Sequence, residues 1–272
     1  MRITASIVTY NCEGEISDVL NSLRQANVAN LKTIIVDNSS KDQTVQIIKE
    51  NFPEVDLIES SVNLGFGRGH NLALKNVESD YHIFINPDIT IHEGEIEKMI
   101  SFMEENPDAV LLNPRVLNPD GSEQYLPKKR PTYKYLFGGR LEKKFAFARR
   151  WRAEYTMRDV VINDPIEIDC ATGCFMFCRT SALKAVGGFD ERYFLYFEDA
   201  DLARKMQQIG KLMYVPSITV VHAWHRENGK IGKSFFYALQ SMRKYFKKWK
   251  KTSKEPILVR EKDQRQKNSF KC

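Results

Sequence analysis

Hydrophobic and polar positions alternate along the first half of the chain in two different rhythms. Short apolar runs, such as ITASIVT at residues 3–9 and YHIFI at residues 81–85, predict buried strands. Between such runs, apolar residues three and four positions apart predict amphipathic helices. Strands are expected at residues 3–9, 32–37, 55–59, 81–85 and 109–112, and helices at residues 15–25, 42–51, 70–76 and 93–105. This alternation predicts an α/β fold with a mostly parallel central sheet flanked by helices.

The second half of the chain has a less regular pattern. Residues 127–155 are basic and aromatic, and we expect them to form a mobile loop or loosely packed helices over a site. Helices are expected at residues 181–186 and 199–209, and strands within residues 166–179 and at residues 211–214 and 219–222. No apolar run is long enough to span a bilayer and no signal-peptide pattern opens the chain, which favours a cytoplasmic protein.

Polar side chains directly follow several of the expected strands. In parallel sheets, ligands bind outside the carboxyl ends of the strands, so these side chains are candidates for a binding site. They are Thr9, Asn11, Asp37, Asn38 and Asp88.

Asp88 is a candidate metal ligand, because Mg²⁺ is usually bound by one or two carboxylates together with substrate phosphates. It follows Asn86 and Pro87, and the proline restricts the backbone just before it. The alternative is an ordinary turn aspartate that accepts local N–H groups. Asp37 and Asn38 could bind a base or ribose edge, or could cap the following helix.

A glycine-rich motif, NLGFGRGHN, occupies residues 63–71. Its spacing differs from the dinucleotide-binding pattern, so it is a weak phosphate-loop signal. The glycines allow close backbone approach or a turn with positive φ, and Arg68 could meet a diphosphate.

Three acids, Glu198, Asp199 and Asp201, crowd against the aromatic stretch YFLYF. Carboxyl groups next to apolar surface have raised pKa values, which suits a general base. The alternative is a helix N-terminus that attracts acids by its dipole, and Asp201 fits that reading. His222 ends a strand and could bind a metal, as could His225, although a lone histidine is more often structural.

Charge is unevenly distributed over the 272 residues, whose net charge is +6. Residues 127–152 hold ten Lys or Arg and one acid, and residues 228–254 hold nine and none. The second segment predicts a basic amphipathic helix, which would bind an anionic membrane surface, dock on the catalytic domain, or serve a homodimer. Its expected apolar stripe is Phe235, Leu239, Met242, Phe246 and Trp249.

The five cysteines do not resemble a disulfide framework. Cys170, Cys174 and Cys178 recur every four residues in an apolar segment, and we expect buried thiols there.

Taken together, the motifs resemble those of the family 2 inverting glycosyltransferases with the GT-A nucleotide-sugar-binding fold. The likeness covers residues 1–226 and is closest to bacterial rhamnosyltransferases of cell-wall and O-antigen polysaccharide synthesis. It rests on IIVDNSS (34–40), NLGFGRGHN (63–71), INPD (85–88), ATGCFMFCR (171–179), GGFDERYFLYFEDADL (187–202) and VVH (220–222), after an opening strand that ends in TYN (9–11).

The resemblance implies roles for individual residues. Asp199 would be the general base, beside Glu198, and Asp88 with His222 would hold Mg²⁺ or Mn²⁺. Asn86 stands where the family's metal motif often has an aspartate. The nucleotide-sugar would be bound by Thr9, Asn11, Asp37, Asn38, Asn63, Gly65, Arg68, Asn71 and Asn86.

The resemblance also implies partners and a domain division. The donor would be dTDP-L-rhamnose or, alternatively, a UDP-sugar, and the acceptor a polyprenyl-diphosphate-linked saccharide at the inner face of the plasma membrane. Residues 1–230 would form the catalytic domain and residues 231–272 a basic helical tail.

Three other functions are disfavoured by the sequence. A sugar-nucleotide nucleotidyltransferase usually has an N-terminal glycine-rich loop with basic residues, which this chain lacks. A nucleic-acid binder would use the basic tail, but strand-end carboxylates would repel phosphates in the absence of a metal. A catalytically silent scaffold is disfavoured because Asp88 and Asp199 are both present.

Overall fold

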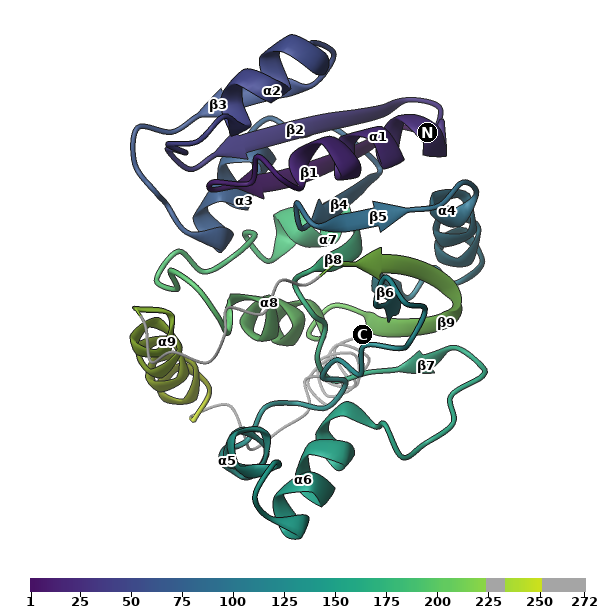
Figure 1. The fold of residues 1–272 in the computed structure, drawn as a ribbon. Helices are drawn as coiled ribbons and strands as arrows, with labels where there is room; N and C mark the ends of the chain where they lie inside the picture. The colour runs from purple at the N-terminus through teal and green to yellow at the C-terminus, as the bar shows by residue number, and fades with distance from the viewer. Residues whose placement is uncertain (224–232, 251–272) are drawn as a thin grey trace, which may run out of the picture.

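The computed structural model describes residues 1–223 and 233–250, except for the side chains of Arg140 and Lys233. His225 and the end of the basic tail lie outside the described residues. Within them, helices surround one central sheet (Figure 1). The strands are β1 (Ile3–Thr9), β2 (Leu31–Asp37), β3 (Asp56–Glu59), β4 (Tyr81–Ile85), β5 (Ile89–Ile91), β6 (Ala109–Leu117), β7 (Ile166–Glu167), β8 (Phe175–Arg179) and β9 (Lys211–His222).

The helices other than α5 and α6, for which no bounds were predicted, agree with the expected positions to within a few residues. They are α1 (Ile16–Ala26), α2 (Thr44–Asn51), α3 (Phe66–Leu74), α4 (Glu95–Glu105), α5 (Tyr133–Leu141), α6 (Ala146–Thr156), α7 (Thr180–Ala185), α8 (Glu198–Met206) and α9 (Lys233–Trp249). The short strands β5 and β7 were not anticipated as separate elements, and the two strands expected at residues 211–214 and 219–222 form the single strand β9.

The α/β fold is confirmed, but the sheet is mixed. Its order is β3-β2-β1-β4-β8-β6-β9-β5, and β7 pairs with β9. Neighbours from β3 to β4 are parallel, whereas β8 runs antiparallel to both β4 and β6. Hydrophobic alternation does not reveal strand direction, and β8 returns to the sheet only after the long excursion through α5 and α6.

Both faces of the sheet are covered, which explains the near-continuous apolar runs in the strands. In β4, Ile83 and Ile85 belong to the core shared with α1 and α4, whereas Phe84 faces α7 and α8. The same alternation occurs in β8. Cys170, Cys174 and Cys178 are buried and free, as expected.

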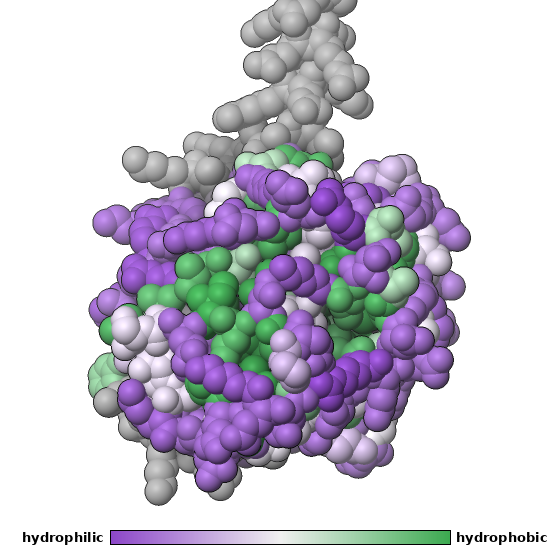
Figure 2. Space-filling view, turned by 90° about the horizontal axis from the view of Figure 1, so that it is seen from above, coloured by the Kyte–Doolittle hydropathy of each residue, from purple (hydrophilic) through white to green (hydrophobic). Residues whose placement is uncertain are grey.

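At one end of the sheet, the edge strand β3 carries ion pairs. Asp56 pairs with Lys32 at 2.6 Å, and Glu59 pairs with Lys49 at 2.7 Å. Figure 2 looks down on this end of the molecule, where hydrophilic residues surround exposed hydrophobic ones. Charged side chains on an edge strand oppose pairing with another sheet.

The basic segment after β6 folds into two packed helices. In this helical hairpin, the rings of Tyr135 on α5 and Tyr155 on α6 stack with centroids 5.0 Å apart. Glu154 accepts hydrogen bonds from the Tyr135 hydroxyl and from the ammonium group of Lys134, and Thr132 caps α5. Of the two expectations for this segment, the structure shows helices.

The basic helix α9 docks against α8 and the loop before it. Tyr245 and Trp249 are buried with Phe197 in one apolar cluster. The Asp201 carboxylate, which is fully buried, accepts hydrogen bonds from Trp249 Nε1 and Lys248 Nζ, both at 2.7 Å. Of the expected roles of α9, docking on the preceding part of the chain is therefore seen in the structure.

The face that α9 buries differs from the expected stripe. Its most buried residues are Ser241, Tyr245 and Trp249, whereas Phe235, Leu239, Met242 and Phe246 are only half-buried. A buried carboxylate needs polar partners. The face of α9 that is buried here brings Trp249 and Lys248 within hydrogen-bonding distance of Asp201. No helix among the described residues is long and apolar enough to cross a membrane.

We predict that Lys248→Met destabilises the protein by about 3 kcal/mol, because it leaves the buried Asp201 carboxylate without its ammonium partner. Urea denaturation measures the change. Lys247→Met removes an exposed charge from the same helix and should change stability by less than about 0.5 kcal/mol. The double variant Asp201→Asn/Lys248→Met should recover part of the loss. Equal effects of the two single lysine variants would contradict this account.

Candidate active site

Pairing of β5 with β9 brings Asp88 and His222 together. Asp88 follows β4, and the next residue, Ile89, pairs with His222 across the two strands. The backbone N–H of Ala223 donates to the Asp88 carbonyl oxygen at 2.9 Å. As a result, Asp88 Oδ1 lies 3.2 Å from His222 Nε2, and both side chains are largely buried.

Gln124 sets the tautomer of His222. Its amide nitrogen donates to the His222 carbonyl and to Asn118 Oδ1, so its oxygen must accept from His222 Nδ1, at 3.0 Å. In a neutral imidazole, Nε2 then carries a lone pair directed at the Asp88 side. Asp88 Oδ1 is buried and accepts no hydrogen bond among the described residues. Two facing acceptors of this kind fit a divalent cation between them.

The described residues contain no group of three or more protein ligands. Asp88 and His222 would therefore supply two ligands of a cation, and oxygen atoms of a phosphate-bearing ligand and water would supply the others. This sharing is usual for Mg²⁺.

Glu198 and Asp199 begin α8 immediately after a strained turn. Tyr196 and Phe197 have φ values of 68° and 67°, a left-handed conformation that is rare for large side chains. Each such residue costs about 1–3 kcal/mol and persists only where surrounding contacts enforce it. Here Phe197 packs against Tyr245 of α9. The turn fixes the direction in which the two acids project.

The two adjacent acids have different surroundings. Asp199 accepts hydrogen bonds from the N–H groups of Ala200 at 2.7 Å and Gly173 at 3.2 Å, which favour its ionised form. Glu198 is 5% exposed, and its Oε2 accepts no hydrogen bond among the described residues. Burial raises the pKa of both carboxyl groups, and with the Asp199 charge beside it the pKa of Glu198 reaches about 8. The N–H groups of Ala200 and Gly173 favour charge on Asp199, so Asp199 is the acid of the pair that ionises more readily.

Residues 173 and 174 connect the Asp88–His222 pair to the Glu198–Asp199 pair through hydrogen bonds. Gly173 donates its N–H to Asp199, and the carbonyl of Cys174 accepts the N–H of Asn86, two residues before Asp88. Burial, with smaller contributions from the Asp88 and Asp199 carboxylates, raises the pKa of Cys174 to about 12. A candidate cation site and a general-base candidate thus lie on either side of one short segment.

The polar residues at the ends of β1 and β2 also lie together. Thr9 Oγ1 donates to Asp37 Oδ1 at 2.9 Å, and Ser40 donates to both Asp37 oxygens. Asn11 Oδ1 accepts the N–H of Lys41 at 2.8 Å. Asp37 therefore does not cap α2, and its buried carboxylate retains little acceptor capacity.

The glycine-rich motif mainly serves packing between protein segments. Gly65 has φ +80°, and a Cβ there would lie 2.2 Å from the carbonyl oxygen of Phe194. Asn63 accepts the Gly65 N–H, and Asn38 donates to the Gly65 carbonyl. The close backbone approach that the glycines permit is therefore to the loop before α8.

Two further donor-site candidates also have protein partners. The Asn71 side chain bonds both the N–H and the carbonyl of Phe189, at 2.8 and 2.9 Å. Arg68 Nε donates to the Glu191 carbonyl at 2.8 Å. Their expected roles in donor binding stay predictions, as do those of Thr9, Asn11, Asp37, Asn38, Asn63, Gly65 and Asn86.

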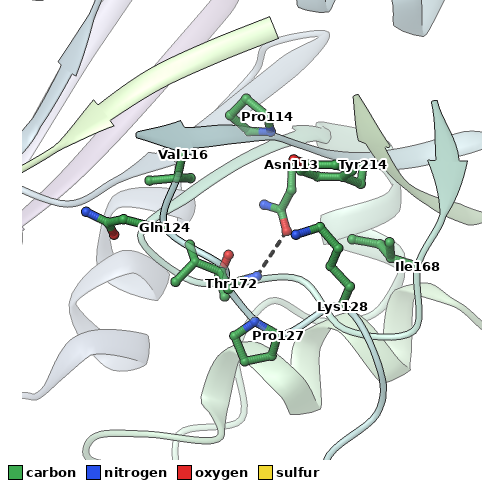
Figure 3. Close-up of a pocket in the computed structure, with 10 residues that line it drawn as sticks. Asn113, Pro114, Val116, Gln124, Pro127, Lys128, Ile168, Thr172 and Tyr214 are labelled. Carbon is green, nitrogen blue, oxygen red and sulfur yellow. Dashed lines mark hydrogen bonds between the residues drawn. The ribbon is translucent and has the colours of Figure 1, made fainter. Parts of the chain in front are cut away.

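A small pocket lies between Gln124 and Thr172, the residue before Gly173 (Figure 3). Lys128 extends into it toward Asn113, whose Oδ1 accepts the Thr172 N–H at 3.0 Å. Lys128 Nζ lies 4.2 Å above the Tyr214 ring, and burial lowers the pKa of this ammonium group. Gln124, Lys128 and Gly173 could not be recognised as site residues from the sequence, because only their neighbours in space distinguish them from other loop residues.

Two curated relatives cover most of the chain. A protein of Mycobacterium tuberculosis named N-acetylglucosaminyl-diphospho-decaprenol L-rhamnosyltransferase is 30% identical over 239 residues, which are 82% of this chain and 76% of that protein. Rhamnosyltransferase WbbL of Escherichia coli is 28% identical over 88% of this chain and 90% of its own length.

A solved structure shares the fold. The mannosyltransferase PcManGT from Pyrobaculum calidifontis, in complex with GDP-Man and Mn²⁺, superimposes with a TM-score of 0.58 at 16% identity. The match covers 84% of this chain and 58% of that one. The model of the glycosyl transferase family 2 matches residues 4–187, and with the two relatives it shows that the chain belongs to this family.

Proposed function

We propose that this glycosyltransferase transfers L-rhamnose from dTDP-L-rhamnose, with inversion, to a lipid-linked saccharide in bacterial surface polysaccharide synthesis. The observation that carries the reaction type is the half-buried Asp199 carboxylate, which accepts the N–H of Gly173, close in sequence to the Cys174 carbonyl that anchors the segment before Asp88 and His222. The choice of sugar and acceptor is supported by the names of the two relatives, one of which specifies a diphospho-decaprenol acceptor.

In the proposed reaction Asp199 takes the proton from an acceptor hydroxyl group. The hydroxyl oxygen forms a bond to the anomeric carbon on the face opposite the nucleotide, and the bond from that carbon to the diphosphate oxygen breaks. The nucleoside diphosphate leaves with the electron pair, so a single displacement inverts the anomeric configuration. The hydrogen bonds from Gly173 and Ala200 keep Asp199 ionised and oriented before the reaction.

A divalent cation, Mg²⁺ or Mn²⁺, fits the Asp88–His222 pair, and the Mn²⁺ in the mannosyltransferase complex supports this assignment. When bound, such a cation neutralises charge on the diphosphate leaving group. Gln124 positions His222 for this role. The side chains at the ends of β1 and β2 would contact the nucleotide.

A UDP-sugar-dependent transferase, galactofuranosyl or other hexosyl, is the alternative, because a few hydroxyl contacts decide the sugar. Nucleotide release from a panel of dTDP-, UDP- and GDP-sugars with a synthetic lipid-linked acceptor tests the proposal. Release from dTDP-L-rhamnose is expected. Release from another donor would overturn the choice of sugar. No release and no donor-induced thermal stabilisation would favour a silent scaffold.

The two adjacent acids should respond differently to amide substitution. Asp199→Asn removes the base and should lower kcat by about 10²–10⁴ while sparing donor binding. Glu198→Gln resembles the protonated glutamic acid expected at neutral pH, so its kcat should stay close to that of the wild type. Steady-state kinetics at pH 7 make the comparison. The opposite ranking would assign the base to Glu198.

Turnover should fall on the acidic side of its pH profile. Asp199 must be ionised to accept a proton, and burial raises its pKa, so activity is lost as pH falls through a value above the ordinary aspartate range of about 3.9. Because Glu198 is already neutral in this range, Glu198→Gln should leave the acidic limb unmoved. A limb at the ordinary aspartate value would indicate that Asp199 is exposed to solvent.

Replacing Gln124 should weaken metal binding without removing a ligand. Gln124→Leu frees the His222 ring from its fixed tautomer, and we expect about 10–100-fold weaker Mn²⁺ binding. Asp88→Ala should abolish both Mn²⁺ binding and turnover. EDTA, which removes the metal ion, should also abolish turnover. Titration calorimetry with Mn²⁺ and a nucleoside diphosphate measures affinity directly. Gln46→Leu on the exposed face of α2 is the matched control, and an equal loss there would contradict the positioning role.

A further inference from the structure

The tip of the α5–α6 hairpin exposes aromatic side chains. Phe145 and Phe147 are 46% and 48% exposed, and their rings stack on each other with centroids 5.4 Å apart. The Phe147 ring also meets Trp151 edge-on at 5.0 Å. In Figure 1 the hairpin lies at the end of the molecule opposite β1, β2 and β3. Exposed aromatic clusters of this kind usually mark an interaction surface.

The same tip is strongly basic. Residues 143–153 contain five Lys or Arg and no acid. The acids that flank this stretch are engaged elsewhere: Glu142 pairs with Arg158 at 3.4 Å, and Glu154 pairs with Lys134 at 2.6 Å. We call residues 143–150 the hairpin tip. Its exposed side chains are Lys143, Lys144, Phe145, Phe147, Arg149 and Arg150.

The basic helix α9 differs from the hairpin tip in what its charges contact. Lys248 is shared between Asp190 and Asp201, and Lys244 donates to the carbonyl oxygen of Arg192 at 2.6 Å. Trp249, the indole that would suit a membrane interface, is buried against α8. Lys244, Lys248 and Trp249 of α9 are thus used inside the protein, whereas Phe236, Arg243 and Lys247 are exposed but form, within the described part of the chain, no stacked aromatic pair with a basic cluster like that of the hairpin tip.

We propose that the hairpin tip, rather than α9, binds the anionic lipid surface that carries the acceptor, a refinement that rests on the proposed function. Lysine and arginine beside exposed phenylalanine suit the boundary between headgroups and acyl chains. Because Phe145 and Phe147 stack on each other, their faces are less available to nucleic-acid bases.

The base of the hairpin links this surface to the catalytic site. The carbonyl oxygen of Lys128 accepts the N–H groups of Asp169 and Cys170, and the carbonyl of Tyr155 accepts those of Lys128 and Lys129. Cys170 lies three residues before the glycine that bonds Asp199. A lipid-linked acceptor held at the hairpin tip would therefore approach the site from the side of Asp199.

Sedimentation with vesicles tests the proposal. Wild-type protein should bind phosphatidylcholine vesicles that contain phosphatidylglycerol and should bind pure phosphatidylcholine much more weakly. Arg149→Gln/Arg150→Gln removes two charges and should weaken binding by about 25-fold, at about fivefold per basic residue. Arg243→Gln/Lys247→Gln removes two exposed charges from α9 and should have little effect. Phe145→Ser/Phe147→Ser should weaken the binding that remains at high salt.

Equal losses from the two charge variants, or no vesicle binding by the wild type, would overturn the inference. So would binding to single-stranded DNA in preference to anionic vesicles. Nucleotide release with a water-soluble, short-chain acceptor should be the same for wild type and both hairpin variants. Failure of vesicle binding with normal release leaves the proposed function intact, whereas absent release with normal vesicle binding refutes the function and retains the surface.

Discussion

Two neighbouring carboxyl groups begin α8, the buried Glu198 and the partly buried Asp199, and much of the surrounding structure fixes their positions. Desolvation favours the neutral acid, so both groups cannot be ionised cheaply. Two backbone N–H groups select Asp199 as the charged partner. The left-handed turn at Tyr196 and Phe197 supplies the direction, and its strain is tolerated because α9 packs on Phe197.

α9 therefore also stabilises α8 and the turn before it. Asp201, one turn beyond the acid pair, would be a third buried carboxylate without Lys248 and Trp249. Because Asp201 has these partners, its negative charge is compensated, whereas neither Glu198 nor Asp199 has a cationic partner among the described residues. Asp201 thus differs from the candidate general base Asp199, two positions before it, in having a cationic and an indole partner.

The two halves of the sheet position different sets of candidate site residues. The parallel half, β3 to β4, ends in the polar side chains that suit a nucleotide. The half that runs from β8 to β5 contributes His222, Gly173 and the segment that meets Asp199. Asp88 stands at the junction, since it lies between β4, the last strand of the parallel half, and β5, which begins at the next residue.

Local periodicity predicted most helices and strands because each buries a continuous apolar face. It could not predict β5, whose three residues carry no period, and so it could not show why Asp88 meets His222. Gln124 looks like any loop glutamine until its amide is seen to bond the histidine at both its carbonyl and its ring. The glycines at 65, 67 and 69 predicted close approach, but not that Phe194, Phe189 and Val8 would be the neighbours.

Charge counts alone also could not distinguish the two basic segments, which contain similar numbers of Lys and Arg. The difference lies in where acids fold against them. Asp190 and Asp201 come from elsewhere in the chain and meet α9, whereas residues 143–150 meet no such partner among the described residues. A basic residue that neutralises a buried carboxylate loses its attraction for lipid, as Lys248 does. The hairpin tip combines exposed basic residues with two exposed, stacked phenylalanines, so the tertiary structure makes it the better suited of the two segments to face a membrane.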